Sequence, residues 1–506
     1  MTTFSSNVPT PAGGFAGGLL ASWRGPADVR DDTYVAEEQA HVRLATLAGI
    51  VLLGLLAGAA VGFAGVNGLL LAVSLVCCTF VLLDFRVGVV LLILLMPLSR
   101  STVFPHALFG MTGANPLNLL MAATLGSCLL HAMFGGGVRR FFPAPLAWLY
   151  VVPIIVAGAL GVRHVSEIAP AFDYVAPLAF HDQAGYLMET VFKPLTIVLF
   201  ALLVGAAVAK SAKPEKFLVP TLVSIWTMSL MTIAYVLLSG IGLGELASSE
   251  SREFFGPLGM HANELGRLYV VAYALLLFTW VESKESGLRL VLVASMAVTA
   301  VALMLTFSRS AFLGFIVVHL LFVIWRLNVR TVFFIGLLVL ALALLPVAVY
   351  ERVATGFGGG LNAISAGRID GLWLPLLPEV LKNPVFGSGH LSMLWSHAMR
   401  ADGGSTVLLV THPHNAYLQA LLDMGIVGLV LACAYFVHVW RRTRALAADP
   451  RLSPTMRGFF AGTAAALVSL LVIGIADSAL TPRSEQAFLW LAIGMMYGQY
   501  AKRPAV

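Results

Sequence analysis

Long apolar runs recur along almost the whole chain, and this feature restricts the possible folds more than any other. About 20 consecutive apolar residues form a helix that crosses the roughly 30 Å hydrocarbon core of a bilayer. Of the 506 residues, 59% are hydrophobic and only 11% are charged, whereas an ordinary soluble domain has about 25% charged residues. So few charges cannot cover a water-soluble surface. The sequence therefore predicts an all-α, polytopic integral membrane helical bundle.

We expect about fourteen transmembrane helices in one bundle, since a single bundle can take up the whole length of the chain. The predicted spans are residues 42–65, 67–84, 86–98, 117–134, 144–162, 186–209, 217–240, 263–281, 288–306, 309–326, 331–349, 413–440, 457–479 and 484–500. The predicted parts are an N-terminal segment (1–41), helices one to eleven (42–349), a large loop (350–412), helices twelve to fourteen (413–500) and a tail (501–506).

The distribution of Lys and Arg predicts the orientation. Short cytoplasmic loops carry an excess of these residues. With a cytoplasmic N-terminus, every inner loop is basic, most clearly at Arg441, Arg442 and Arg444, whereas the opposite orientation leaves segments such as 163–185 inside. Both termini are therefore expected in the cytoplasm, and the 350–412 loop in the periplasm. The net charge of +6 is explained by these loops, so no nucleic-acid partner is expected.

Three ionisable residues converge on the predicted outer face. Arg309 begins the tenth span, Arg368 lies in the large loop, and His414 opens the twelfth span. Charged side chains near membrane spans are costly and are first considered as functional. Arginine binds phosphate oxygens through two parallel hydrogen bonds, and histidine can accept a proton from a hydroxyl at neutral pH. The set is suited to a pyrophosphate and a proton acceptor.

Each of these residues also has a purely structural explanation. Arg309 can be an anchor at a helix end that reaches towards the membrane surface, and Arg368 a solvated loop charge or a partner of Asp370. His414 can be a helix N-cap or an interfacial histidine, and His412, two residues earlier, can compete with it.

A polar stripe follows His414 along the twelfth span. Asn415, Gln419 and Asp423 recur at intervals of four residues on an otherwise apolar helix. Lipid cannot satisfy such groups, so the stripe must face the bundle interior or a wet cavity. We expect this helix to line a site, with Asn415 and Gln419 as candidate substrate-binding residues.

Three segments together resemble the O-antigen ligase and polysaccharide polymerase superfamily of bacterial envelope proteins. They are SRSAFLG, RIDGLWLPLLPEVLKNPVFGSG and HNAYLQALLDMGIVGLVL. The family pairs an R-x3-L element with an H-x10-G element, which are here Arg309 with Leu313 and His414 with Gly425. Between them the family's loop residues match Arg368, Trp373, Asn383, Pro384, Gly387 and Gly389. Upstream, GPLGMHANELG resembles the family's segment through Gly259 and Asn263, so the resemblance covers about residues 252 to 430.

The resemblance implies a GT-C-like glycosyltransferase of the bacterial inner membrane, with its active site at the periplasmic face. The donor would be an undecaprenyl-diphosphate-linked oligosaccharide and the acceptor a hydroxyl, with inversion and without a metal, cofactor or nucleotide sugar. Arg309, Arg368 and His414 would be catalytic. Asn263, Arg267, Trp373 and His412 are further substrate-binding candidates. Arg267 has an alternative, an ion pair with Glu264 or another bundle residue.

Several functions remain open from the sequence. We favour an exopolysaccharide or O-antigen polymerase because of the extended N-terminal segment and the large loop. A ligase that transfers glycan to lipid A core, and a protein O-oligosaccharyltransferase, share the chemistry and differ in acceptor. Membrane lipids, a flippase and a chain-length regulator are the further expected partners. A transporter or lipid flippase is the different class, kept open by Glu189, Lys193 and Asp477 within predicted spans.

Overall fold

The structure is a computed structural model. It describes residues 32–108, 111–113, 115–134, 142–168, 172, 178–248, 250–326, 347–354, 358–399, 410–476 and 480–502. These residues are overwhelmingly helical, and the predicted polytopic helical membrane fold is confirmed. The chain divides into two compact units, Met1–Ala72 and Val73–Val506, and each is considered by itself.

The first unit holds most of helix α1 (Asp32–Leu83). A kink at Gly65, with φ 55° and ψ −133°, interrupts this helix. Glycine adopts this backbone conformation more readily than any residue with a side chain. The kink coincides with the boundary between the predicted spans 42–65 and 67–84. Gly58–Leu83 is the part of α1 that qualifies as a candidate membrane span.

In the described part of the chain, nine helices are long and apolar enough to cross a membrane. Besides Gly58–Leu83, they are Pro116–Met133, Ala144–Glu167, Gln183–Lys210, Pro214–Ser239, Ala262–Glu282, Ser286–Leu305, Ala416–Ala447 and Pro454–Ile473. Three other predicted spans are helices of fewer than 18 residues: α2 (Phe85–Leu95), α13 (Arg309–Trp325) and α20 (Ala487–Ala501). The predicted span 331–349 lies outside the described residues, except for its last three, which belong to α15 (Val347–Ala354).

The remaining elements, with their bounds, are these: β1 (Ala107–Leu108), β2 (Met111–Thr112), α3 (Pro116–Phe134), α4 (Ala144–Leu146), η3 (Ala147–Val151), α5 (Val152–Gly161), η4 (Val162–Glu167), α7 (Gln183–Leu187), η5 (Met188–Phe192), α8 (Lys193–Lys210), η6 (Pro214–Phe217), α9 (Leu218–Ser239), α10 (Leu243–Leu246), η7 (Glu250–Leu258), α11 (Ala262–Glu282), α12 (Ser286–Leu305), α16 (Gly360–Ile364), η8 (Ile369–Trp373), α17 (Leu374–Lys382), η9 (Ser392–Trp395), η10 (His397–Met399), α18 (Ala416–Ala447), α19 (Pro454–Ile473) and η11 (Ser484–Gln486). The two strands form a minimal antiparallel pair.

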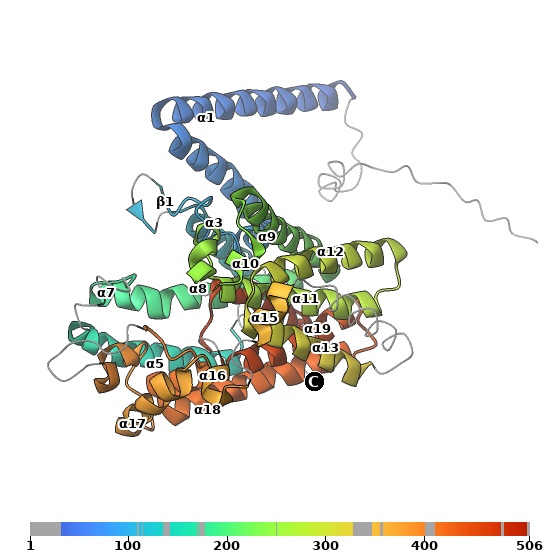
Figure 1. The fold of residues 1–506 in the computed structure, drawn as a ribbon. Helices are drawn as coiled ribbons and strands as arrows, with labels where there is room; N and C mark the ends of the chain where they lie inside the picture. Colours follow the sequence, from blue (N-terminus) through green and yellow to red (C-terminus); the bar gives the residue numbers. More distant parts are fainter. Residues whose placement is uncertain are drawn as a thin grey trace, which may run out of the picture. The chain divides into compact units, whose positions relative to one another are not determined.

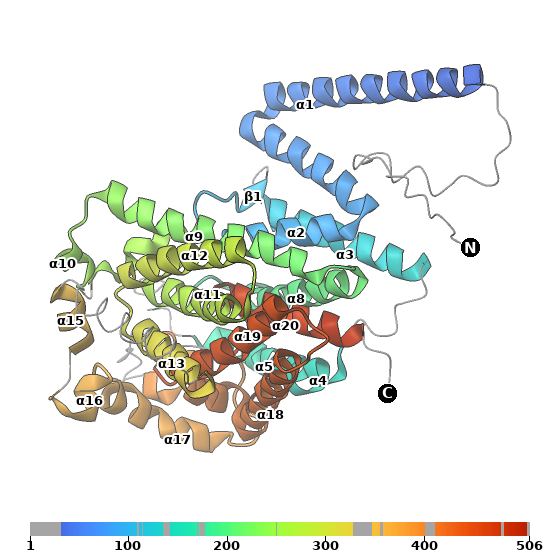
Figure 2. The same ribbon diagram turned by 90° about the vertical axis from the view of Figure 1, so that its right-hand side faces the viewer.

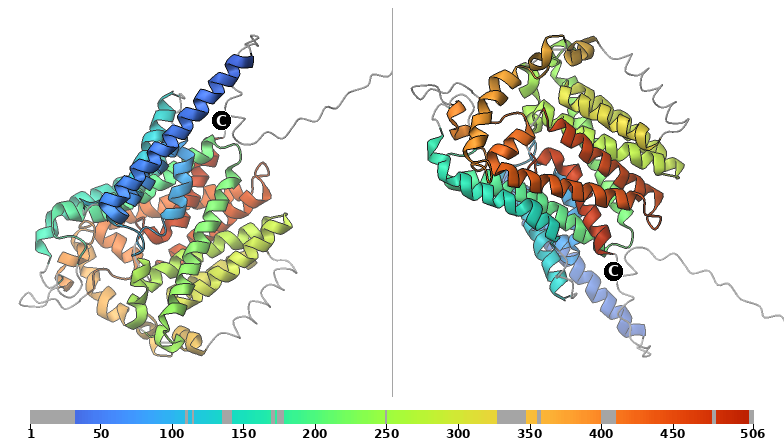
Figure 3. Two further views of the ribbon diagram at one scale, coloured as in Figure 1. Left: turned by 90° about the horizontal axis from the view of Figure 1, so that it is seen from above. Right: turned by 90° about the horizontal axis from the view of Figure 1, so that it is seen from below.

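Helices α11 and α19 form the centre of the second unit. Figures 2 and 3 show them side by side, with α12, α13 and α18 packed around them. Small residues allow this close approach: a Cβ atom at Gly458 would lie 2.5 Å from the Phe278 carbonyl oxygen, and one at Gly462 would lie 2.6 Å from that of Ala274. Glycines four residues apart are typical of tightly packed membrane helices. We call this region the bundle core.

A second apolar cluster lies apart from the bundle core. It contains Phe172, Phe180, Tyr186, Leu372, Leu376, Met393, Leu394, Trp395, Leu418 and Leu422. Most of these residues come from η8, α17 and η9 of the predicted large loop and from the first turns of α18. We call the folded segment 358–399 the cap; its helix α17 packs against α18, as Figure 1 shows. The loop expected between spans is thus a packed region with its own core.

The opposite end of the bundle is basic. Helix α8 ends at Lys210, and α18 carries Arg444 in its last turn. The Arg444 guanidinium lies 4.2 Å from the ring centre of Trp325 at the end of α13. We refer to the two ends as the basic end and the cap end. The basic end is the one that the distribution of charge assigns to the cytoplasm.

Candidate active site

His414 lies immediately before α18, in a strained backbone conformation. Its φ is +49°, a left-handed value that costs about 1–3 kcal/mol for a residue with a side chain. The N-cap of α18 is the next residue, Asn415, whose side-chain oxygen accepts hydrogen bonds from the Tyr417 and Leu418 amides at 3.0 and 3.1 Å. The explanation of His414 as an N-cap is therefore wrong. Asn415, predicted to bind substrate, has a structural use for its oxygen.

His412 lies against His414. The two ring centres are 4.1 Å apart, and the rings are inclined by 55°. Both residues are half-buried, and the Thr411 hydroxyl lies 3.2 Å from Nδ1 of His412. The two imidazoles therefore lie side by side at the cap end. His412 could take the proposed role of His414 or assist it.

The polar stripe of α18 faces protein, as predicted. Gln419 and Asp423 are buried, and the Gln419 amide nitrogen lies 3.4 Å from Oδ2 of Asp423. Oδ1 of Asp423 accepts hydrogen bonds from the amide and the hydroxyl of Ser392, at 3.1 and 3.0 Å. Nδ1 of the buried His390 is 3.7 Å from Oδ2. Asp423 of the stripe thus bonds to the cap. Gln419, whose buried Oε1 lacks a hydrogen bond, is the residue of the stripe that remains a candidate for substrate binding.

Arg368 and Trp373 are both tied to the segment around His414. Arg368 precedes η8, and its Nη1 donates a 2.6 Å hydrogen bond to the Ala476 carbonyl. Trp373 ends η8, and its Nε1 donates a 2.8 Å hydrogen bond to the carbonyl of Pro413. The amide of Ala416 donates to the Gly474 carbonyl at 2.8 Å. Through the turn that follows α19, the cap therefore brings Arg368 and Trp373 to the segment that holds His414.

Arg309 starts α13 at the same end of the bundle. Five residues further on, Gly314 accepts a 2.8 Å hydrogen bond from the Ser469 hydroxyl, and a Cβ at Gly314 would touch Ile473. Five residues of helix rise about 7.5 Å. Helix α13 runs parallel to α11, since Gly266 lies near Ala311 and Phe278 near Phe322, whereas α19 runs antiparallel to α11. Arg309 therefore lies beyond Ile473 towards the cap end, at about the level of Ala476, the hydrogen-bond partner of Arg368.

Asn263 positions the start of α13. Its side-chain oxygen accepts a 2.7 Å hydrogen bond from the hydroxyl of Ser308, the N-cap residue directly before Arg309. Its backbone amide donates to Nδ1 of His261 at 3.1 Å within the N-cap of α11. Asn263 thus joins the first turns of α11 and α13 and fixes the N-cap residue that precedes Arg309.

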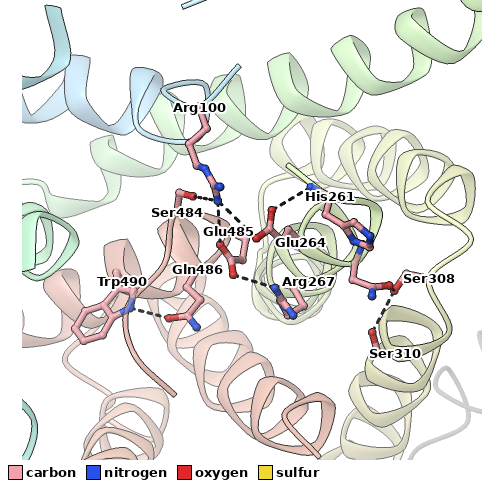
Figure 4. Close-up of polar contacts among 11 residues, drawn as sticks. Arg100, His261, Glu264, Arg267, Ser308, Ser310, Ser484, Glu485, Gln486 and Trp490 are labelled. Atoms are coloured by element: carbon pink, nitrogen blue, oxygen red, sulfur yellow. Dashed lines mark hydrogen bonds and ion pairs between the residues drawn. The ribbon is translucent and has the colours of Figure 1, made fainter. Parts of the chain in front are cut away.

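Arg267 is a member of a buried ion pair. Its Nη2 donates a 2.9 Å hydrogen bond to Oε1 of Glu485, and both side chains are at most 3% exposed. Figure 4 shows this pair within a larger group in which Arg100 lies 3.6 Å from Glu264 and 4.0 Å from Glu485. The alternative of an ion pair therefore holds, with Glu485 as the partner. Arg267 also lines a cavity together with Ala416 and Gly474, which places it close to the His414 segment.

Residues 291–433 match a family model described as O-antigen ligase. The chain carries a domain of the O-antigen ligase family. This stretch includes Arg309, Arg368 and His414 together with the cap, and the resemblance predicted from the motifs is confirmed. Members of the family are glycosyltransferase-like ligases and polymerases, and the match supports a multi-pass membrane enzyme of this kind. No curated protein sequence matches the chain.

Two glycines of the O-antigen ligase motifs allow a close backbone contact between the cap and α18. Gly425, at the end of the H-x10-G element, has φ 63° and ψ −170° and breaks α18. A Cβ there would lie 2.3 Å from the Val385 carbonyl oxygen, and a Cβ at Gly387 would lie 2.5 Å from the carbonyl carbon of Asp423. Both motif positions therefore require glycine for packing rather than for chemistry.

The sequence motifs do not point to Glu485, to Arg100 or to the pairing of His390 with Asp423. Glu485 stands at the start of the predicted span 484–500, and a lone acid at a span end was the only signal for it. Within the described part of the chain, no three His, Cys, Asp or Glu side chains are grouped as a metal site would need.

The residues that keep transport open are located differently. Glu189 and Lys193 form an ion pair on one helix, and the Lys193 side chain is largely exposed. Lys193 is seventeen residues from Lys210 at the basic end, which is about 25 Å along the helix. The pair therefore lies close to the cap-end boundary of a roughly 30 Å hydrocarbon core. Asp477 lies outside the described residues.

Proposed function

We propose that the protein transfers a glycan from a lipid-diphosphate donor to an acceptor hydroxyl at the periplasmic face of the bacterial inner membrane. The observation that carries this proposal is the convergence of three sequence-distant elements. The cap bonds through Arg368 and Trp373 to the two segments that flank His414, and Arg309 begins α13 at the same level. Family membership supports glycan and lipid-linked substrates.

The two arginines supply charge for the leaving group. As the bond between the anomeric carbon and the diphosphate oxygen breaks, negative charge grows on that oxygen. Guanidinium groups that are already oriented stabilise such charge most strongly in a partly dehydrated site. Arg309 and Arg368 are both half-buried, which is the environment that this role requires.

His414 acts on the acceptor. Its imidazole takes the proton of the acceptor hydroxyl while the hydroxyl oxygen forms a bond to the anomeric carbon. Attack occurs on the face opposite the diphosphate, so the configuration inverts and the lipid diphosphate leaves with the electron pair. Holding both reactants at one membrane surface supplies the proximity that the reaction needs.

We favour a polymerase, in which the acceptor is a second lipid-linked glycan, over a ligase that uses lipid A core or a protein acceptor. This preference rests on the extended N-terminal segment and on the large loop whose described part forms the cap. The proposed partners are a flippase, which delivers the donor to the periplasmic face, and a chain-length regulator, which acts on the product. Undecaprenyl diphosphate is the proposed carrier, and both termini are placed in the cytoplasm.

The test uses the purified full-length protein in vesicles, first with an undecaprenyl-diphosphate-linked oligosaccharide as the sole substrate and then with lipid A core added. A ladder of products that lengthens with time supports a polymerase. Movement of a single glycan block only when lipid A core is added supports a ligase.

Variants Arg309→Ala, Arg368→Ala and His414→Ala should each abolish transfer. Arg163→Ala is the matched control, because it removes an exposed arginine at the cap end that has no part in the site. Wild-type product levels in the Arg309 and His414 variants would reject the mechanism. Equal losses in the Arg163 variant would show that net charge at this end is responsible.

A further inference from the structure

Residues 374–389 of the cap form a hairpin that runs along α18. The hairpin consists of α17 and the segment 383–389. At its start, Trp373 bonds to the carbonyl of Pro413, just before α18 begins. At its far end, the Ile426 amide donates a 2.8 Å hydrogen bond to the carbonyl of Pro384. The chain therefore descends beside the first half of α18, and Figure 2 shows α17 on the outside of the bundle, next to α18.

Residues 384–389 of the hairpin form hydrogen bonds with the backbone groups that lose their helical partners at the break in α18. In an uninterrupted helix, the amides of Ile426 and Val427 would donate to the carbonyls of Leu422 and Asp423. Here these two amides donate to Pro384 and Val385, while the two carbonyls accept from Ser388 and Gly389, at 2.8 to 3.2 Å. All four backbone groups are paired. Complete pairing is what irregular backbone needs at membrane depth.

Contacts with neighbouring helices indicate how far the hairpin reaches into the membrane. His390, directly after it, donates its amide to the carbonyl of Ala157, and its Nε2 lies 3.1 Å from that of Ile154. Ile154 and Ala157 follow Ala144, the first residue of its candidate span, by ten and thirteen residues, or about 15 and 20 Å of helix. Both values lie within the roughly 30 Å hydrocarbon core. The carbonyl of His390 also accepts a 2.7 Å hydrogen bond from the hydroxyl of Tyr186, which is 24 residues from Lys210, or about 36 Å along the helix. His390 therefore lies near the outer edge of the core, and the turn of the hairpin lies deeper.

Helix α18 leads to the same conclusion. Trp440 precedes the basic run at Arg441 and Arg442, which marks the basic end of the span. Gly425 is fifteen residues away from Trp440, or about 22 Å along the helix. The turn of the hairpin therefore lies several ångströms inside the far edge of a 30 Å core.

The outward face of the hairpin is largely apolar; its exposed polar residues are Asn383 and Lys382, and Lys382 forms an ion pair with Glu379. Leu377, Leu381, Val385 and Phe386 are exposed, with Leu381 at 75% and Phe386 at 61%, while Leu376 on the opposite side is fully buried in the cap. On α18, the exposed Ile426, Val427 and Val430 continue this surface. They belong to a membrane-spanning helix, so the apolar face of the hairpin is continuous with a surface that already contacts lipid.

We propose that residues 374–389 form a re-entrant hairpin that inserts into the outer leaflet, with Leu377, Leu381, Val385 and Phe386 against lipid acyl chains. The hairpin directly follows Trp373 and thus connects the lipid phase with the candidate active site. The insertion itself does not depend on the proposed reaction.

The test measures the environment of single spin labels in vesicles of phosphatidylethanolamine and phosphatidylglycerol. Cys77, Cys78, Cys128 and Cys433 are replaced by alanine, and one cysteine is introduced at Phe386 or, as a second variant, at Leu381. Val430→Cys is the lipid-facing control on α18. Ala184→Cys is the aqueous control, because this exposed residue is 26 residues from Lys210, about 39 Å along the helix.

Oxygen collects in the hydrocarbon phase, whereas a neutral nickel chelate stays in water. Labels at Phe386 and Leu381 should collide more often with oxygen than with the chelate, as the label at Val430 does, and the Ala184 label should show the reverse ratio. Chelate collisions at Phe386 and Leu381 equal to those at Ala184 would overturn the proposal. Low collision rates with both reagents would also overturn it, because a protein partner or a second copy would then cover the face.

Discussion

The bundle core and the cap are both apolar inside, but different interactions hold them together. In the bundle core, glycines of α19 lie against the backbone of α11, and packing of regular helices does most of the work. In the cap, irregular backbone is paired with the broken helix α18, and buried side chains such as Asp423 bond to loop amides. Regular packing stabilises a span, whereas irregular pairing places particular groups. The candidate site accordingly lies where the cap meets the bundle.

The largest expected effect concerns the imidazole at this junction. His414→Ala should lower glycan transfer by about 100-fold or more, because a positioned general base contributes a factor of that order. His412→Ala should cause a smaller loss, since the strained backbone is at His414. The measurement is the initial rate of product formation by protein that elutes as a single species. A greater loss in the His412 variant would exchange the roles of the two histidines.

A large effect on stability is expected within the bundle, at the pair of Arg267 and Glu485. Arg267→Ala should destabilise the protein by about 3–5 kcal/mol, because it leaves the Glu485 carboxylate buried beside one fewer cation. Thermal unfolding in detergent reports the change. The double variant Arg267→Met with Glu485→Leu is the control and should recover much of the loss. An unchanged unfolding temperature in Arg267→Ala would mean that the ion pair does not form.

Two glycine variants compare the regions directly. Gly425→Ala places a methyl group against the Val385 carbonyl at a left-handed φ, which costs about 1–3 kcal/mol of backbone strain and should displace the hairpin. Gly462→Ala crowds α11 and α19 by a similar 1–3 kcal/mol. We expect Gly425→Ala to lose transfer activity even well below its unfolding temperature. Gly462→Ala should unfold earlier while the folded protein retains its activity.

Gly126→Ala serves as the control for both glycine variants, since a Cβ at this position of α3 meets no neighbouring atom. Its activity should match that of the wild type, and its unfolding temperature should be equal or slightly higher, because alanine is the better helix former. The opposite outcome is that Gly425→Ala and Gly462→Ala change the transfer rate and the unfolding temperature in the same proportion. That result would contradict the idea that the bundle core stabilises the protein while the cap positions the groups of the site.

The smallest expected effect is at the start of α13. Arg309→Lys keeps the charge but loses the planar, two-pronged donor, so it should restore only part of the activity that Arg309→Ala removes. Rates of the two variants at saturating donor make the comparison. Full activity in the lysine variant would show that Arg309 acts as a simple positive charge.

Hydropathy predicted most of the spans well because each apolar run is long enough to cross lipid by itself. Hydropathy was less informative for helices that are apolar but shorter than a membrane span. Helices α2, α13 and α20 are apolar yet span only 11, 17 and 15 residues. The 350–412 segment was predicted as a large periplasmic loop. Its described part folds into the cap, and residues 384–390 contact α5 and residues 422–427 of α18. The near-helical spacing of apolar residues in 372–381 indicates the helix α17, but it does not indicate which part of the bundle this helix contacts.

The site shows the same division. Motif residues such as Arg309, Arg368 and His414 are visible in the sequence because their spacing from leucine and glycine is characteristic. The partners of other residues are not visible, because they depend on contacts between distant segments. Arg267 and Glu485 are 218 residues apart, and Trp373 bonds to a carbonyl 40 residues away.

The sequence by itself determined that this chain is a multi-pass helical membrane protein with O-antigen ligase motifs, since apolar length and motif spacing are local properties. Only the tertiary structure decided which charges are paired inside the bundle, that Asn415 rather than His414 caps α18, and how far the cap descends beside α18. Those outcomes depend on the need of every buried polar group for a partner, and for each of these groups that partner is fixed by how the chain folds in three dimensions.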